Sequence, residues 1–287
     1  MATRQSTAGF EQVDATSQGD NLAAYLDLMT ELPAVRAYRR RMVELLAAGT
    51  EDPGRGNVSG DQRWLDLGCG TGSETARLAS GELPGTVIGA DASLHMLARA
   101  RRRPLPSPEG EKHPSVGAAD ARRLPFADGA FDGCRAERIL QHLHDPGDAV
   151  AELARVCRPG GRVVVSEPDW GTMAVDVEDR DLARRVLGAM SERVPCGWIG
   201  RRLPALFRAA GLEIVAVEAH ALSVEGYSSA DGFFGIASGA LRALEADLLS
   251  AVDTARWLAA LEQREKESPL VASLTGFTVC GRRPVAS

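Results

Sequence analysis

From Arg63 onward the chain alternates short apolar runs with helical patterns, and this alternation limits the possible folds more than any other feature of the sequence. Helical patterns begin at about Ser73 and Ser93, and another around Val150 places apolar residues on one face. Strands that alternate with helices form a mostly parallel sheet that is covered on both faces. We therefore predict a doubly wound α/β fold with strands at residues 64–67, 86–91, 116–119, 131–135, 162–166, 213–218 and 273–280.

Further helical segments flank the alternating region. Upstream, Asp20 is a candidate N-cap for one helix, and Pro33 is well placed to open a second. A stretch rich in glycine and polar residues at 49–60 follows and is predicted to be a loop. Downstream helices are predicted at 181–190, 201–210, 230–249 and 252–264. We divide the chain into N-terminal helices that cover the site (1–60) and an α/β domain (61–287) with a helical insertion at about 223–270.

Charge and cysteine content argue against several classes of protein. The formal net charge is −6, whereas nucleic-acid-binding domains usually carry a basic excess, so we assign the arginine runs at 39–41 and 101–103 to helix surfaces. The cysteines form no C-x-x-C pair, and His142 and His144 lack a third ligand, so no metal site is expected. With no apolar leader or membrane-length apolar run, we expect a cytoplasmic protein without membrane or nucleic-acid partners. Its oligomeric state, with a homodimer as one option, is not defined.

A glycine-rich loop follows the first predicted strand directly. Gly68, Gly70 and Gly72 would form a tight turn at the carboxyl end of that strand, where open α/β sheets bind ligands close to the backbone. The dinucleotide-binding fingerprint needs a further glycine at position 73, which is Ser73 here. The spacing therefore disfavours a nicotinamide or flavin enzyme.

Acidic residues end the next two predicted strands. Asp91 lies about 20 residues beyond the loop, where a carboxylate can accept hydrogen bonds from a ribose diol. Asp120 follows the third strand and could accept the exocyclic amine of adenine, while Met96 could lie against the ring. Asp66 has two interpretations, since its carboxylate could tie down loop amides or meet an amino group of a ligand. These features predict an adenosine ligand.

Several motifs together resemble the class I S-adenosylmethionine (SAM) dependent methyltransferases, and most of all the subfamily of ubiquinone and menaquinone C-methyltransferases and bacterial natural-product methyltransferases. These motifs are the loop at 66–72, residues 89–93, Ala119-Asp120 before 124–126, residues 131–132 before 140–142, and the turn at 154–161. The resemblance implies a seven-stranded sheet in the order 3-2-1-4-5-7-6 with the last strand antiparallel, and SAM as cofactor. The residues it implies or supports as cofactor-binding are Asp66, Gly68, Cys69, Gly70, Gly72, Asp91, Ala92, Met96, Asp120, Ala121, Arg135 and Ala136.

The acceptor site is defined less well by the sequence. His142 follows the fourth strand and is our candidate for a general base, although the same residue could serve only in local packing. Trp170 follows the fifth strand and could form the wall of an apolar pocket, as could Trp198 and Phe233 farther on, with core packing as the alternative. Tyr25 and Arg36 could cover the cofactor from the leading helices.

We therefore expect an enzyme that transfers a methyl group from SAM to a small, partly apolar acceptor, at oxygen or carbon, such as a secondary metabolite or a quinone-like molecule. Methyl transfer requires mainly that the acceptor be held in line with the methyl carbon, so a base is optional. Two alternatives remain open from the sequence: a SAM-binding protein of the same fold that rearranges or cyclises its substrate, and a binding module without catalysis.

Overall fold

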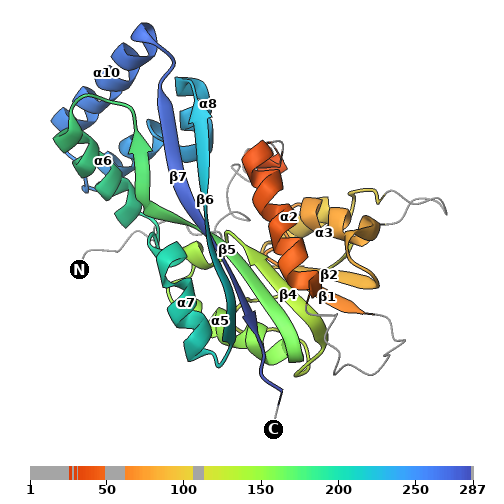
Figure 1. The fold of residues 1–287 in the computed structure, drawn as a ribbon. Coiled ribbons are helices and arrows are strands. Elements are labelled where there is room, and N and C mark those ends of the chain that lie inside the picture. Colours follow the sequence, from red (N-terminus) through yellow and green to blue (C-terminus); the bar gives the residue numbers. More distant parts are fainter. Residues whose placement is uncertain (1–25, 28, 31, 49–61, 106–112, 286–287) are drawn as a thin grey trace, which may run out of the picture.

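A seven-stranded sheet forms the centre of the molecule in the computed structural model, which describes residues 26–27, 29–30, 32–48, 62–105 and 113–285 (Figure 1). The strand order is β3-β2-β1-β4-β5-β7-β6. All neighbours are parallel except β7, which is antiparallel to both β5 and β6. Both the predicted order and the antiparallel last strand are therefore confirmed. The strands are β1 Arg63–Leu67, β2 Thr86–Asp91, β3 Ser115–Ala118, β4 Phe131–Glu137, β5 Cys157–Val175, β6 Glu213–Glu225 and β7 Val271–Arg282.

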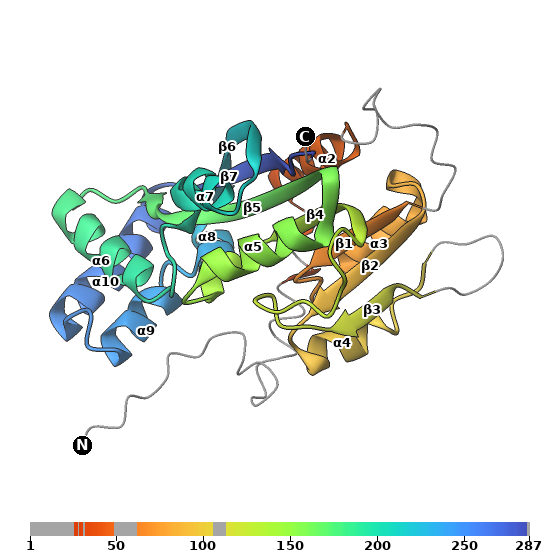
Figure 2. The same ribbon diagram turned by 90° about the horizontal axis from the view of Figure 1, so that it is seen from below.

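Helices cover both faces of the sheet (Figure 2). On one face, α2 and α3 pack on Trp64, Val87 and Val164; on the other, α5 and α7 pack on Leu65 and Val163. Neighbouring residues of a strand therefore point to opposite faces of the sheet, and both are apolar because both faces are covered. The helices are α2 Pro33–Ala47, α3 Ser73–Arg77, α4 Leu94–Ala100, α5 Pro146–Val156, α6 Arg180–Glu192, α7 Ile199–Ala209, α8 Tyr227–Phe234, α9 Ser238–Glu245 and α10 Ala251–Glu267, with one π turn Leu78–Glu82 and one 3₁₀ turn Leu140–His142.

The parallel register brings several strand ends to one edge. Leu67 of β1 is level with Ala90 of β2 and with Ala136 of β4, and Asp91 is level with Ala118 of β3. Residues that follow these strands therefore lie close together, at the edge where open α/β sheets bind ligands.

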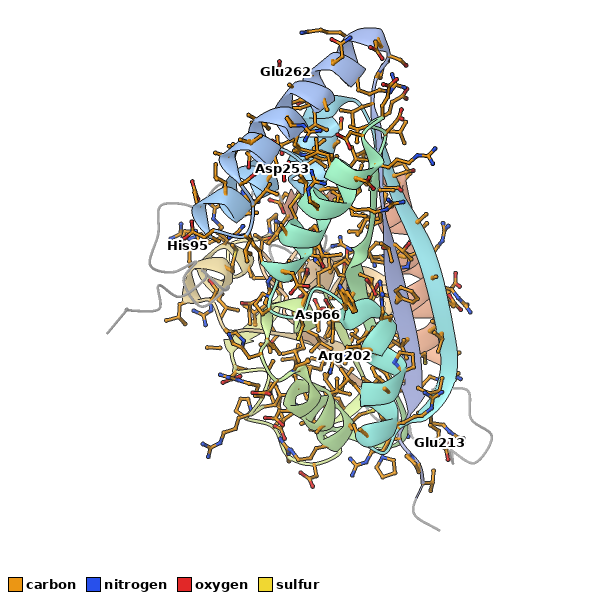
Figure 3. All side chains as sticks on the ribbon, turned by 90° about the vertical axis from the view of Figure 1, so that its left-hand side faces the viewer. Asp66, His95, Arg202, Glu213, Asp253 and Glu262 are labelled. Carbon is orange, nitrogen blue, oxygen red and sulfur yellow. The ribbon has the colours of Figure 1, made fainter. Side chains whose placement is uncertain are left out.

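Three strands continue well past this edge. β5, β6 and β7 are longer than predicted. We call their distal halves, together with the helices that they carry (α6, α8, α9 and α10), the roof (Figures 1 and 2). In Figure 3, Asp253 and Glu262 lie along α10 in the upper part of the molecule, whereas Asp66 lies lower, among the strands. The roof therefore stands over the carboxyl edge on a continuation of the same sheet.

One sequence prediction differs from the structure in this region. The segment 230–249 is not one helix, because Gly235 adopts a left-handed φ of 66° and ends α8 before α9 begins. Such a residue is a common helix stop. The N-terminal helix predicted from Asp20 falls largely outside the described residues. Among the described helices, none combines the length and the apolar character needed to cross a bilayer.

Candidate functional site

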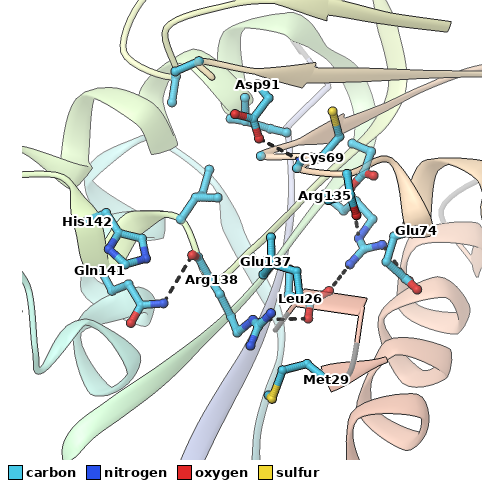
Figure 4. Close-up of a pocket in the computed structure, with 18 of the residues that line it drawn as sticks. Leu26, Met29, Cys69, Glu74, Asp91, Arg135, Glu137, Arg138, Gln141 and His142 are labelled. Atoms are coloured by element: carbon cyan, nitrogen blue, oxygen red, sulfur yellow. Dashed lines mark hydrogen bonds and ion pairs between the residues drawn. The ribbon is translucent and has the colours of Figure 1, made fainter. Parts of the chain in front are cut away.

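A cavity of ≈ 660 Å³, which we call the first cavity, lies between the carboxyl edge of the sheet and the roof (Figure 4). Glycine-loop residues form one side, and residues of the roof, among them Leu222, Phe234 and Leu274, form another. The predicted site residues that line it are Asp66, Gly68, Cys69, Gly70, Asp91, Ala92, Asp120, Ala121, Arg135, His142, Trp170 and Phe233. Residues that are far apart in the sequence therefore meet in one pocket.

Three predicted cofactor residues lie outside this lining. Gly72 is the left-handed N-cap of α3, so its contribution is to the shape of the loop. Met96 is 1% exposed and Ala136 is not exposed at all, because α4 and β4 turn these side chains into the core. The predicted contact of Met96 with an adenine ring is therefore not made from the cavity surface.

Some of the predicted acceptor residues also lie outside the first cavity. Arg36 is exposed and does not line the first cavity, and its Nε donates at 3.1 Å to the backbone oxygen of Thr30, which does line it. Trp198 is 52% exposed and lines a second cavity behind Trp170. Tyr25 lies outside the described residues.

The glycine loop has the backbone conformation that only glycine adopts at low cost. Gly68, Gly70 and Gly72 have φ values of 73°, 51° and 74°. A Cβ atom on Gly68 would lie 2.0 Å from Cγ2 of Ile139, and one on Gly72 would lie 2.8 Å from Cβ of Ala100. Because Gly68 and Gly70 present bare backbone to the cavity, a ligand can approach the loop closely.

Carboxylates stand beside this loop. Asp91 accepts hydrogen bonds from the backbone nitrogens of Gly70 and Ser93, both at 2.8 Å, and so joins the loop to the end of β2. Asp120 is exposed and accepts from Nε and Nη2 of Arg122 at 3.1 and 2.9 Å. The hydrogen bonds from Arg122 lower the pKa of Asp120 below its ordinary value. Both carboxylates line the cavity as acceptors for hydroxyl or amine donors.

A buried network of charges forms the floor of the cavity. Arg135 donates to Glu74 at 3.0 Å and to Glu137 at 2.5 Å. Arg39 of α2 reaches the same two carboxylates at 3.1 and 2.9 Å. Tyr38, also on α2, donates to Glu137 at 2.5 Å. The N-terminal helix is therefore tied to the end of β4 by charge-assisted hydrogen bonds.

The charges in this network alter the ionisation of its members. Burial by itself disfavours a charged Glu137, but Arg39 and Arg135 outweigh that effect and hold its pKa well below the usual range. Asp66 is 3% exposed and accepts from Thr75 Oγ1 at 2.7 Å, and burial raises its pKa despite the nearby Arg135. The hydrogen bond from Thr75 gives Asp66 a structural role within the fold.

Glu167 organises the turn that carries His142. Its carboxyl group accepts the backbone N–H groups of Ile139 at 2.8 Å, Leu140 at 2.7 Å and Gln141 at 3.4 Å. Burial raises the pKa of Glu167 to about 8, although these N–H groups act in the opposite direction. Burial, together with the charge of Arg138, lowers the pKa of His142 to about 4, so its imidazole is neutral near pH 7.

Glu74 and Glu137 are not among the predicted site residues. The assignment of Arg39 to a helix surface is wrong, because Arg39 pairs with both carboxylates and is 7% exposed. One signal was available, because β4 contains the run Arg135-Ala-Glu137, and charged side chains in a strand buried between two layers require partners. Its partners are 98 residues away in α2 and 61 residues away in α3, so the sequence could not name them.

Comparisons with known proteins place this site in a family. Residues 65–165 match the family described as "Methyltransferase domain". The "Uncharacterized 37.1 kDa protein in transposon TN4556" of Streptomyces fradiae is 36% identical over 258 residues, which are 89% of this chain and 70% of that protein. A demethylmenaquinone methyltransferase of Beutenbergia cavernae is 34% identical over 165 residues, which are 55% of this chain and 60% of that protein.

Solved structures of other proteins share the fold. The crystal structure of a protein from Bacillus halodurans C-125 has a TM-score of 0.55 and 15% identity, covering 85% of this chain and 99% of the other. The chain belongs to the SAM-dependent methyltransferases. Its cofactor is SAM, and the bare glycine backbone, the carboxylates of Asp91 and Asp120 and the size of the first cavity fit that molecule.

Proposed function

We propose that the acceptor is a small, partly apolar molecule that is methylated at oxygen or carbon. The observation that carries this proposal is the two-sided lining of the first cavity. The carboxylates and the glycine loop, with Leu26 and Ile139 against the loop, lie on one side, whereas the other side is apolar and is formed by Met29, Trp170, Leu222, Phe233, Phe234 and Leu274. An apolar wall with few polar groups is typical of sites for small organic ligands.

The residues of the chain have three tasks in this reaction. When bound, SAM supplies an electrophilic methyl carbon on a sulfonium, and its carbon–sulfur bond breaks as the bond to the acceptor forms. The apolar wall holds the acceptor in line and keeps water away. The neutral imidazole of His142 lies in the cavity and is available to take the proton that an acceptor hydroxyl or acidic carbon loses.

The preference for oxygen or carbon is supported by the relatives. A demethylmenaquinone methyltransferase, by its name, acts on a quinone-like acceptor, and its similarity to this chain extends over 165 residues. A neutral amine, by contrast, needs no base, so a histidine in the cavity would not speed its methylation.

Methyl transfer from isotopically labelled SAM to a matched pair, 4-propylphenol and 4-propylaniline, tests the proposal. We expect label in the methyl ether or ring-methylated phenol and at least tenfold less in the aniline. Phe233→Ala should raise the KM for the phenol, whereas Leu241→Ala, which removes a leucine 44% exposed on α9, should leave it unchanged. Preferential labelling of the aniline, or a KM unaffected by Phe233→Ala, would contradict the proposal.

A further inference from the structure

A second cavity of ≈ 430 Å³ lies between the distal part of β5 and α6. Its lining is mainly apolar and includes Met173, Val175, Val177 and Leu187. Trp198 stands at its rim, where the guanidinium of Arg201 lies 4.9 Å from the indole ring.

Trp170 is the one described residue that lines both cavities. It lies in an irregular part of β5, where the pairing with β7 passes from Asp169 opposite Thr275 to Ala174 opposite Ser273. The additional residues bulge out of the ladder, as often happens beside active sites. The indole Nε1 donates to Gln141 Oε1 at 2.7 Å, which fixes the ring in the partition between the cavities.

The bulge is held at its base by polar contacts. Arg201 forms a pair with the fully buried Asp169 through Nε at 2.5 Å and Nη2 at 2.6 Å. Thr172 donates to the backbone oxygen of Asp169 at 2.7 Å and accepts from the backbone nitrogen of Thr275 at 2.9 Å. The position of Trp170 is thus determined by the fold and does not depend on a ligand.

We propose that the second cavity binds the apolar tail of an extended acceptor, whose reactive end lies in the first cavity. This inference rests on the proposed function, since it assigns a second part to the same acceptor. Trp170 is then the residue against which the acceptor turns from one cavity into the other. The acceptor is accordingly an amphipathic molecule with an aliphatic chain, too long for the first cavity alone.

Gly188 offers a way to fill the second cavity without disturbing the fold. It lines the cavity, and a Cβ atom at this position would meet nothing within 4 Å. Because Gly188 lies within α6, a larger residue should not weaken the helix. Gly232 of α8 is the matched control, since it is also helical and open but lines neither cavity.

Binding is tested first, with 1-octanol as the probe and tryptophan fluorescence as the signal, because Trp170 and Trp198 line the second cavity whereas Trp64 and Trp257 are buried. We expect Gly188→Phe to weaken 1-octanol binding at least tenfold and Gly232→Phe to leave it unchanged. Equal binding by wild type and Gly188→Phe would overturn the proposal.

Methyl transfer tests the assignment to the acceptor. With phenol and 4-octylphenol as acceptors, the wild type should show a lower KM for the longer molecule, and Gly188→Phe should abolish that advantage while the kcat with phenol stays the same. An advantage that persists in Gly188→Phe, with 1-octanol binding lost, would show that the acceptor does not use the second cavity. If no phenol is methylated at all, the proposed function fails, and the 1-octanol titration still decides whether the cavity binds an apolar chain.

Discussion

Replacing Gly68 with alanine tests the geometry of the glycine loop directly. The substitution places a Cβ in left-handed backbone at φ 73° and 2.0 Å from Cγ2 of Ile139. Left-handed backbone costs an alanine about 1–2 kcal/mol, and the reduced freedom of the unfolded chain returns about 0.4–1 kcal/mol. Displacing Ile139 adds about 1–3 kcal/mol of overpacking. We therefore expect Gly68→Ala to lower the free energy of unfolding by about 2–4 kcal/mol.

Gly211 provides the control, because it shares the backbone conformation of Gly68 without its crowding. Its φ is 76°, and a Cβ there would meet nothing within 4 Å. Gly211→Ala should cost only about 1 kcal/mol, the backbone contribution alone. Urea unfolding followed by circular dichroism measures both variants, and isothermal titration with S-adenosylhomocysteine should show weaker binding only for Gly68→Ala. If the two variants lose the same stability, or if Ile139→Ala does not relieve the cost at Gly68, the contact geometry is wrong.

Further predictions concern the charged residues of the site. Asp91→Ala should weaken S-adenosylhomocysteine binding at least tenfold in isothermal titration, because the variant lacks both the carboxylate that accepts hydrogen bonds from the ligand and the hydrogen bond from the backbone of Gly70. Unchanged affinity would contradict a role of Asp91 in cofactor binding. Glu137→Gln should cost about 3–5 kcal/mol in urea unfolding, since it leaves buried arginines uncompensated, whereas Glu218→Gln, in an exposed pair, should cost less than about 1 kcal/mol. The pKa of Glu167 rises from 4.5 in the unfolded chain to about 8 in the fold, so the protonated carboxyl stabilises the fold below pH 4.5, and this stabilisation is lost as the pH rises through about 8. In urea unfolding between pH 5 and 8, the free energy of unfolding of the wild type should therefore fall relative to that of Glu167→Gln by about 1.4 kcal/mol per pH unit. A difference that stays constant with pH would refute the raised pKa. His142→Gln should lower kcat by about 10²-fold or more if the imidazole is the base, and a kcat within threefold of wild type would reduce it to a packing role.

The sequence predicted the sheet well where the pattern is local. The strands that end in Leu67 and Asp91 have continuous apolar runs and sharp boundaries, so their ends and the residues that follow them could be named in advance. The distal half of β5 could not, because residues 167–175 mix acidic, glycine and aromatic positions without a period. That part is a strand because β7 pairs with it, and β7 lies about a hundred residues later in the chain.

Some residues of the site could likewise be predicted from local sequence, and others could not. Asp91 and Asp120 follow strands directly, so a local motif reveals them. Met96 lies on a helix whose rotation the sequence did not define, and the structure turns its side chain into the core. The charges on Arg39 and Glu137 are informative only as a pair, and that pairing arises when α2 crosses the sheet. Residue type alone therefore indicates the ligand edge, while long-range packing decides which side chains reach it.

The continuation of β5, β6 and β7 into the roof has a mechanical consequence. Enzymes often admit substrate by swinging a lid on a flexible hinge, but here the cover and the base share backbone hydrogen bonds along β7, from Val271 beside the roof to Arg282 at the far end of the sheet. Tilting the roof would break several of these bonds at once or bend the whole sheet, which is a stiff motion. Access by an acceptor therefore depends on side chains and loops at the margins of the cavity, and turnover should depend little on any large movement of the roof.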